Sequence, residues 1–85
     1  MGAQREGPRV YVVPDSTLFV KDLMKACPDL TVTTVYASAD FTIEVDGATY
    51  TLLDRWGDVV HVYGPTLRFR RMMREMCSEM MDGNH

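Results

Sequence analysis

The sequence predicts an α+β fold, a two-layer sandwich in the order β-α-β-β-β-β-α with a mainly antiparallel sheet and two helices on one face. Turn residues divide the middle of the chain into short segments of alternating polarity, which is typical of strands joined by hairpins. A helical pattern bounded by prolines precedes these segments, and a strongly amphipathic helical pattern follows them. Both apolar helix faces therefore have one sheet face to cover.

A short strand and a helix open the predicted domain. Residues 9–13 (Arg-Val-Tyr-Val-Val) form the strand, which Pro14 stops. Asp15 or Ser16 then caps the helix through a side-chain oxygen. Pro28 ends this helix near Cys27, because the residue before a proline disfavours helical geometry. The apolar stripe of the helix comprises Phe19, Val20, Leu23, Met24 and Cys27.

Strands are predicted near residues 31–36, 41–45, 48–53 and 58–63. Asp46-Gly47 favours a two-residue type I′ hairpin, in which both central residues have positive φ. Residues 54–58 fit a three-residue loop with a left-handed Gly57, and Ser38-Ala39 fits a two-residue loop. A slip of one residue would turn a strand over, and these turns agree on one inner face: Val32, Tyr36, Phe41, Ile43, Val45, Tyr50, Leu52, Val60 and Val62. Much of the outer face is threonine, as expected of a solvated sheet face, but Leu53, Val59, His61 and Tyr63 break this pattern toward one edge.

The last helix is predicted to begin at Gly64 or Pro65, because proline suits the first helical position. At about 100° per residue, one arc carries its apolar side chains: Phe69, Met72, Met73, Met76, Cys77 and Met80. The opposite side carries Arg68, Arg70, Arg71 and Arg74. Met81 lies nearer to the polar side than to the apolar arc.

The chain of 85 residues is long enough for one small domain, which we place at residues 9–82, with a leader at 1–8 and a tail at 83–85. An apolar content of 46% and a charged content of 25% are ordinary for a globular protein and argue against disorder. No apolar run approaches the roughly 18 residues that span a bilayer. Residues 1–9 lack the apolar core of a signal peptide. We therefore expect a cytoplasmic protein that does not act at a membrane.

The two cysteines, Cys27 and Cys77, are far apart and lack metal-site spacing, so a zinc site is poorly supported. Both lie on apolar helix faces, and we expect buried free thiols, with no metal and no cofactor. Copper(I) is a remaining alternative, because thioethers and thiolates are soft ligands. Its candidate ligands would be Met73, Met76, Cys77 and Met80, although their amphipathic placement favours packing.

The arginines are the least expected feature of the sequence. The net charge is −3, yet residues 64–74 contain four arginines and no acidic residue. The positive end of the helix dipole disfavours cations there. Arg71 has an acidic residue one turn later, Glu75, whereas Arg68, Arg70 and Arg74 have none. Two interpretations stay open: arginines that are solvated or paired within the protein, or a surface that binds an acidic protein or a nucleic acid.

Other candidate residues are fewer. Trp56 occupies a hairpin tip, where it folds back on Arg55 or the sheet, or else anchors a partner. Met81 could contribute to a dimer or partner interface, because methionine-rich surfaces adapt to varied partners. No nucleophile and base occur with an orienting third group. An enzyme would need a site completed by an oligomer, with His61 and Tyr63 as its candidates.

The α-β-β-β-α outline of residues 15–81 resembles the double-stranded-RNA-binding domain. In that family basic residues at the start of the final helix contact phosphates, so the resemblance implies this role for Arg68, Arg70, Arg71 and Arg74. The sequence lacks the family's Lys-Lys-x-Ala-Lys run and has an additional strand. The resemblance therefore concerns topology and charge placement.

From the sequence we expect a small non-enzymatic interaction module, an adaptor or inhibitor like those of phages and mobile elements. It would bind a protein partner through the arginine- and methionine-rich last helix, with Arg68, Arg70, Arg71, Arg74, Met81 and Trp56 as contact residues. Homodimerisation is compatible with this role. Nucleic-acid binding through the four arginines is the alternative, and the overall acidic charge favours a protein partner.

Overall fold

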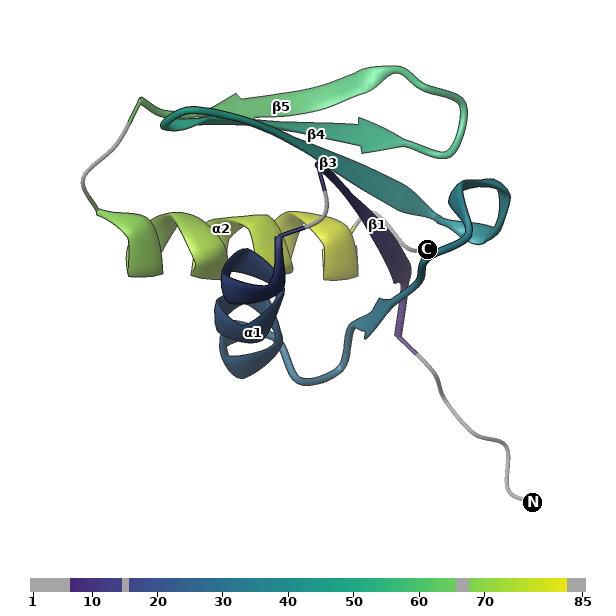
Figure 1. The fold of residues 1–85 in the computed structure, drawn as a ribbon, viewed down its shortest axis with the longest axis horizontal. Helices are drawn as coiled ribbons and strands as arrows, with labels where there is room; N and C mark the ends of the chain where they lie inside the picture. Colours follow the sequence, from purple (N-terminus) through teal and green to yellow (C-terminus); the bar gives the residue numbers. More distant parts are fainter. Residues whose placement is uncertain (1–6, 15, 66–67, 83–85) are drawn as a thin grey trace.

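The computed structural model describes residues 7–14, 16–65 and 68–82, in the element order expected from the sequence (Figure 1). The strands are β1 (Arg9–Val13), β2 (Thr31–Val32), β3 (Phe41–Asp46), β4 (Thr49–Asp54) and β5 (Val59–Tyr63). The helices are α1 (Thr17–Ala26), the short 3₁₀ helix η1 (Tyr36–Ser38) and α2 (Phe69–Asp82). The predicted tail at 83–85, residues 1–6 of the predicted leader and the alternative cap Asp15 lie outside the described residues.

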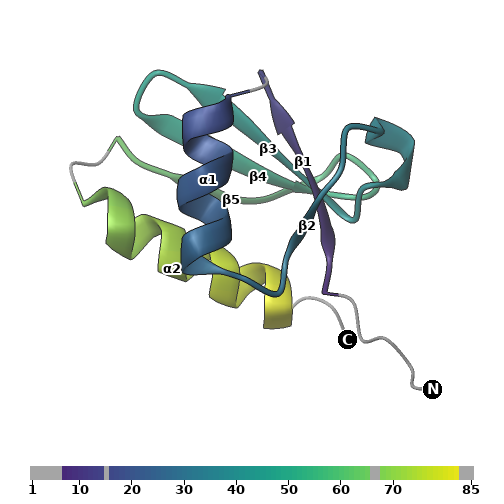
Figure 2. The same ribbon diagram turned by 60° about the horizontal axis from the view of Figure 1, so that its bottom comes forward.

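The five strands form one sheet in the order β2-β1-β3-β4-β5. The antiparallel meander β3-β4-β5 makes up most of it, and β1 runs parallel to its neighbours β2 and β3. Helices α1 and α2 form a second layer on one face of the sheet (Figures 1 and 2). The predicted α+β two-layer sandwich is therefore confirmed.

The strand predicted at residues 31–36 is wrong beyond Val32. Strand β1 occupies the edge of β3 where that strand was expected, pairing Val10 with Phe41. The Thr33 side chain then accepts a hydrogen bond from the Val35 amide at 3.1 Å and bends the chain. Residues 36–38 form η1 in place of a hairpin. Tyr36, expected on the inner face, is consequently 60% exposed.

The β3–β4 turn lies one residue later than predicted. Asp46 pairs with Thr49, so Gly47 and Ala48 are the two central residues. Gly47 has a φ of 62°, and Ala48 has no positive φ, which fits a type II′ turn with glycine first. The partner of each β3 residue shifts by two positions, and Ile43 faces Leu52. Because side chains alternate with a period of two, the predicted inner face of both strands survives.

The β4–β5 loop is as predicted, but the register of β5 is not. Gly57 is left-handed with a φ of 84°, and its amide donates to the Asp54 carbonyl at 3.0 Å. Leu53 pairs with Val59 while Leu52 pairs with His61, so Val60 is an extra, bulged residue. The bulge moves the rest of β5 by one position. Tyr63 therefore enters the core at 7% exposure, and Val62 is 50% exposed.

The core lies between the sheet and both helices. Ser16 caps α1, accepting from the Phe19 amide at 3.3 Å, and α1 ends at Ala26 as predicted. Helix α2 begins at Phe69 and not at Gly64 or Pro65. Of the predicted stripe on α1, Met24 is exposed. The buried apolar residues are Val10, Val12, Phe19, Leu23, Cys27, Leu30, Phe41, Ile43, Leu52, Tyr63, Met72, Met73, Met76 and Met80.

A disulfide joins Cys27, at the end of α1, to Cys77 in α2. The prediction of free thiols is therefore wrong, although Cys27 is buried as expected. The two Cα atoms are 5.6 Å apart, a usual separation for a disulfide. Packing both apolar helix faces on the same face of the sheet brings the cysteines together (Figures 1 and 2). Fifty residues separate them in the sequence, so sequence spacing gave no sign of this contact.

Candidate functional site

A groove of about 530 Å³ separates α1 from α2, which lie next to one another in Figure 2. Its floor is apolar and its rim is charged. The lining residues are Asp22, Lys25 and Ala26 of α1 and Phe69, Arg70, Met73 and Arg74 of α2. We call this side of α2 the groove flank.

The walls of the groove are fixed at two places along α2. Near the start of α2, Phe69 packs edge-on against Phe19 of α1, with ring centroids 6.1 Å apart. Tyr50 of β4 stacks on Phe19 and lies 6.0 Å from Phe69. Two turns further along, the Cys27–Cys77 disulfide joins the helices covalently. The groove is thus held by the core beneath it.

Positive charge dominates the rim of the groove. Arg70 and Arg74 are exposed and spaced i, i+4, so they are neighbours on one helix face. Within residues 7–14, 16–65 and 68–82, neither makes an ion pair. Lys25 lines the same groove from α1, and Asp22 is its acidic residue. Like charges at this spacing destabilise a helix by about 0.2–0.5 kcal/mol. A bound carboxylate or phosphate would offset that repulsion.

The other side of α2, which we call the β5 flank, is a shallower depression of about 220 Å³. It is lined by Arg68, Arg71, Met72 and Glu75 together with Tyr63 of β5. Arg71 forms the expected ion pair with Glu75, at 3.3 Å between Nε and Oε2. The four predicted arginines therefore do not form one patch: Arg70 and Arg74 line one flank, and Arg68 and Arg71 line the other.

Tyr63, on the β5 flank, has a hydroxyl group whose pKa is shifted from its ordinary value. Burial and, to a smaller extent, the negative charges of Glu79 and Glu75 together raise the pKa of its hydroxyl from 10.0 to about 12. The hydroxyl therefore stays protonated at neutral pH. His61 contacts this ring, with centroids 4.4 Å apart. The two residues lie on the inner side of the sheet, since they pair with Leu52 and Tyr50, and not on the predicted outer face.

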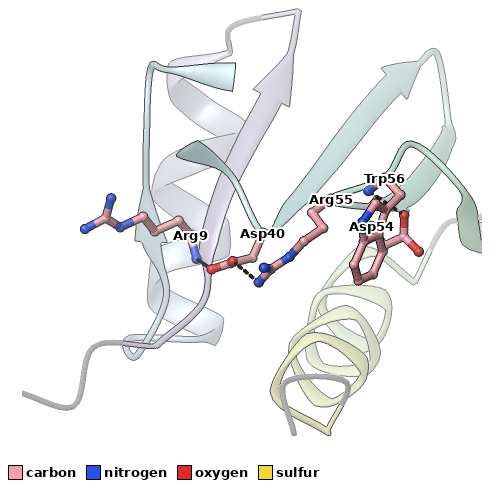
Figure 3. Close-up of polar contacts among 5 residues, drawn as sticks. All are labelled: Arg9, Asp40, Asp54, Arg55 and Trp56. Carbon is pink, nitrogen blue, oxygen red and sulfur yellow. Dashed lines mark hydrogen bonds and ion pairs between the residues drawn. The ribbon is translucent and has the colours of Figure 1, made fainter. Parts of the chain in front are cut away.

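Trp56 is 78% exposed at the β4–β5 turn, where polar contacts define the turn (Figure 3). The Asp54 carboxylate accepts from the amides of Trp56 and Asp58 at 3.0 and 2.9 Å. The Arg55 guanidinium lies 5.6 Å from the Trp56 ring centroid and donates to Asp40 at 2.6 Å. The expected contact of Trp56 with Arg55 is present, and the indole ring remains largely exposed.

Trp56 is separated from the groove by the length of β5. Its turn lies at the start of β5, whereas α2 begins near the opposite end of that strand (Figure 1). Met81, 37% exposed, lies near the end of α2 and does not line the groove. Of the predicted contact residues, the structure therefore places only Arg70 and Arg74 at the groove, and Arg68 and Arg71 lie together on the β5 flank. The α1 wall was missed, because helix periodicity does not show which helix faces meet.

The described residues give little support to a metal site or a membrane-spanning helix. The methionines of the alternative copper set are buried in the core, and its only thiol, Cys77, is in the disulfide. No group of three or more His, Cys, Asp or Glu side chains in the described parts of the chain is arranged to hold a metal ion. Neither α1 nor α2, the α-helices of the described chain, is long and apolar enough to cross a bilayer.

Comparison with known proteins gives no relative: no family model, no curated protein and no solved structure matches this chain. The fold and the groove define a small α+β domain with a cationic cleft between two helices.

Proposed function

We propose that the protein is a small non-enzymatic interaction module, an adaptor or inhibitor, that binds an acidic protein partner through α2. The main support is the pair of exposed arginines, Arg70 and Arg74, which have no ion-pair partner within the described residues and lie beside an apolar cleft. Arginine beside apolar surface is typical of the residues that carry binding energy in protein interfaces.

Nucleic-acid binding through Arg68, Arg70, Arg71 and Arg74 is the second candidate. It would require a broad surface of one charge, because duplexes are bound through many phosphates. These arginines lie on two flanks of α2, Arg71 is neutralised by Glu75, and Asp22 lines the groove. The net charge is also −3. These observations favour a protein partner.

Self-association is compatible with the proposal, and we propose that it would use a different surface. The sheet face away from the helices carries Tyr11, against which Tyr36 packs at 5.6 Å. Val59 and Val62 are exposed. Sedimentation velocity across a range of protein concentrations tests for a homodimer.

The cytoplasmic location stays a prediction. Disulfides are more typical of proteins in oxidising compartments. The Cys27–Cys77 bond therefore favours a location in such a compartment over the cytoplasm. Alkylating free thiols in the native host before lysis tests this: labelled Cys27 and Cys77 would indicate a reducing location, and unlabelled cysteines an oxidising one.

Affinity capture from the native host, with and without nuclease, tests the proposed function. Three baits are compared by quantitative mass spectrometry: the native chain, Arg70→Glu/Arg74→Glu, and Arg68→Glu/Arg71→Glu, which makes the same charge change on the β5 flank. We expect a nuclease-resistant protein that the first double variant loses. Nuclease-sensitive recovery, or equal recovery with all three folded baits, would contradict the proposal.

A further inference from the structure

We propose that the groove between α1 and α2 binds an acidic amphipathic helix of the partner, with apolar side chains on its floor and carboxylates against Arg70 and Arg74. This inference rests on the proposed function and specifies which part of a partner is recognised.

The floor of the groove suits large apolar side chains. Phe69 and Ala26 provide an aromatic ring and a methyl group in a space of about 530 Å³, and Met73, which also lines this space, is only 1% exposed. Methionine is unbranched and adjusts to the shape of what it contacts. The groove is comparable in volume to sites that hold small ligands, roughly 300–1,000 Å³. It can therefore accept one or two large side chains, and a sugar-phosphate backbone has no such group to place there.

The rim suits carboxylates one helical turn apart. Arg70 and Arg74 project from successive turns of α2, and their Cα atoms are separated by a rise of about 6 Å along the axis. Glutamates at i and i+4 of a bound helix have the same spacing. Guanidinium groups hold carboxylates through paired, charge-assisted hydrogen bonds. Lys25 on the α1 wall adds a third cation on the opposite rim.

An amphipathic helix satisfies both requirements at once. Apolar residues at i, i+3 and i+4 form one stripe, and acidic residues flank that stripe. Helices seated in apolar grooves are a recurrent mode of peptide recognition. Asp22 lies on the α1 wall, so the carboxylates of the ligand are expected on the α2 side.

Fluorescence anisotropy with designed peptides tests the inference. The probe is a labelled helical peptide of about twelve residues, roughly 18 Å long, with a Leu/Trp stripe flanked by Glu. Three comparison probes are used: the same peptide with Glu replaced by Lys, the same peptide with Leu and Trp replaced by Ser, and a labelled single-stranded oligonucleotide of similar length. All four are titrated with the full chain at two salt concentrations.

We expect the acidic amphipathic peptide to bind and each comparison probe to bind at least about tenfold more weakly. Arg70→Glu/Arg74→Glu should weaken binding of the peptide by about tenfold to a hundredfold. Arg68→Glu/Arg71→Glu changes the net charge equally on the β5 flank and should have little effect. Lys25→Glu should weaken binding less than the groove-flank double variant. Circular dichroism confirms that each variant is folded.

Several outcomes would overturn the inference. Equal weakening by the two double variants would mean that the peptide responds to overall charge and not to the groove. Tight binding of the serine-substituted peptide would remove the apolar floor from recognition. Preferential binding of the oligonucleotide would assign the arginines to nucleic acid. If no peptide binds while capture still returns a protein through Arg70 and Arg74, the groove inference fails and the proposed function stands.

Discussion

The arginines on the two flanks of α2 have different electrostatic surroundings. On the β5 flank, Arg71 is neutralised by Glu75, and the depression borders a buried tyrosine. On the groove flank, Arg70 and Arg74 repel one another across one turn and have no ion-pair partner within the described residues. Arginine is therefore paired with an acidic residue on one side of α2, whereas on the other side two arginines repel one another.

This difference is the reason for proposing the groove flank, and not the β5 flank, as the binding surface. Surface residues that oppose stability persist where function requires them. Methionines on both flanks of α2 pack in the core, so the methionines alone do not distinguish the two sides. The distinction comes from the charges and from the α1 wall.

The largest expected effect comes from matched core methionines on the two flanks. Met73→Ala on the groove flank and Met72→Ala on the β5 flank both remove a buried side chain. Each should lower the free energy of unfolding by about 2–5 kcal/mol, measured by urea denaturation. Only Met73→Ala should also weaken the binding of the acidic amphipathic peptide. Met81→Ala should leave stability nearly unchanged, and a loss equal to the other two would show that α2 packs differently.

The disulfide should have the next largest effect. Cys27→Ala/Cys77→Ala opens a covalent loop across 50 residues, and native disulfides in small domains typically contribute about 2–5 kcal/mol. We expect a loss in the lower part of that range, because the core still holds both helices. Peptide affinity should also fall as the groove walls loosen. Identical melting temperatures for the native chain with and without reductant would contradict this.

Tyr63 provides a pH test on the β5 flank. Below about pH 10 its hydroxyl is protonated in both the folded and the unfolded chain, so it adds no pH dependence. Between about pH 10 and 12 the unfolded chain loses that proton while the folded chain keeps it, because the folded pKa is raised to about 12. Stability should therefore fall over this range by about 1–3 kcal/mol. The drop should be smaller in Tyr63→Phe, and an identical profile would exclude Tyr63 as its source.

The smallest effects are expected from single arginine substitutions, and they should differ between the two flanks. Arg70→Ala removes the repulsion with Arg74 and a cation near the start of α2, so it should stabilise the fold by about 0.3–1 kcal/mol. Arg71→Ala relieves the helix dipole but loses the Glu75 pair, so its net effect should be near zero. Thermal unfolding at low and high salt measures both changes. A stability loss for Arg70→Ala would show that this arginine has an intramolecular role.

Local patterns predicted the elements of this fold well, and the arrangement between elements less well. The cap at Ser16, the left-handed Gly57 and the buried methionines depend on neighbouring residues and were predicted. Strand order was not, because nothing in the 31–36 segment shows that β1 would take its place beside β3. Nothing in the valine-rich sequence of β5 indicates a bulge at Val60. That bulge shifts the register of the rest of β5 by one residue.

The candidate site was predicted only in part for the same reason. Periodicity placed Arg70 and Arg74 opposite the core, but it could not show that α1 lies beside them. The groove exists because both helices cover one sheet face, and the Cys27–Cys77 contact follows from the same packing. Such contacts become visible only when the helices are placed in space.

The disulfide makes the middle of the chain a closed covalent ring that contains β2, β3, β4 and β5. Arg55 is exposed at the tip of the β4–β5 turn, inside that ring. A protease that cuts after Arg55 would therefore open the ring without releasing a fragment. The nicked protein would migrate as one species until it is reduced, and then as two. A backbone break in this turn therefore leaves the two pieces joined across the helix layer.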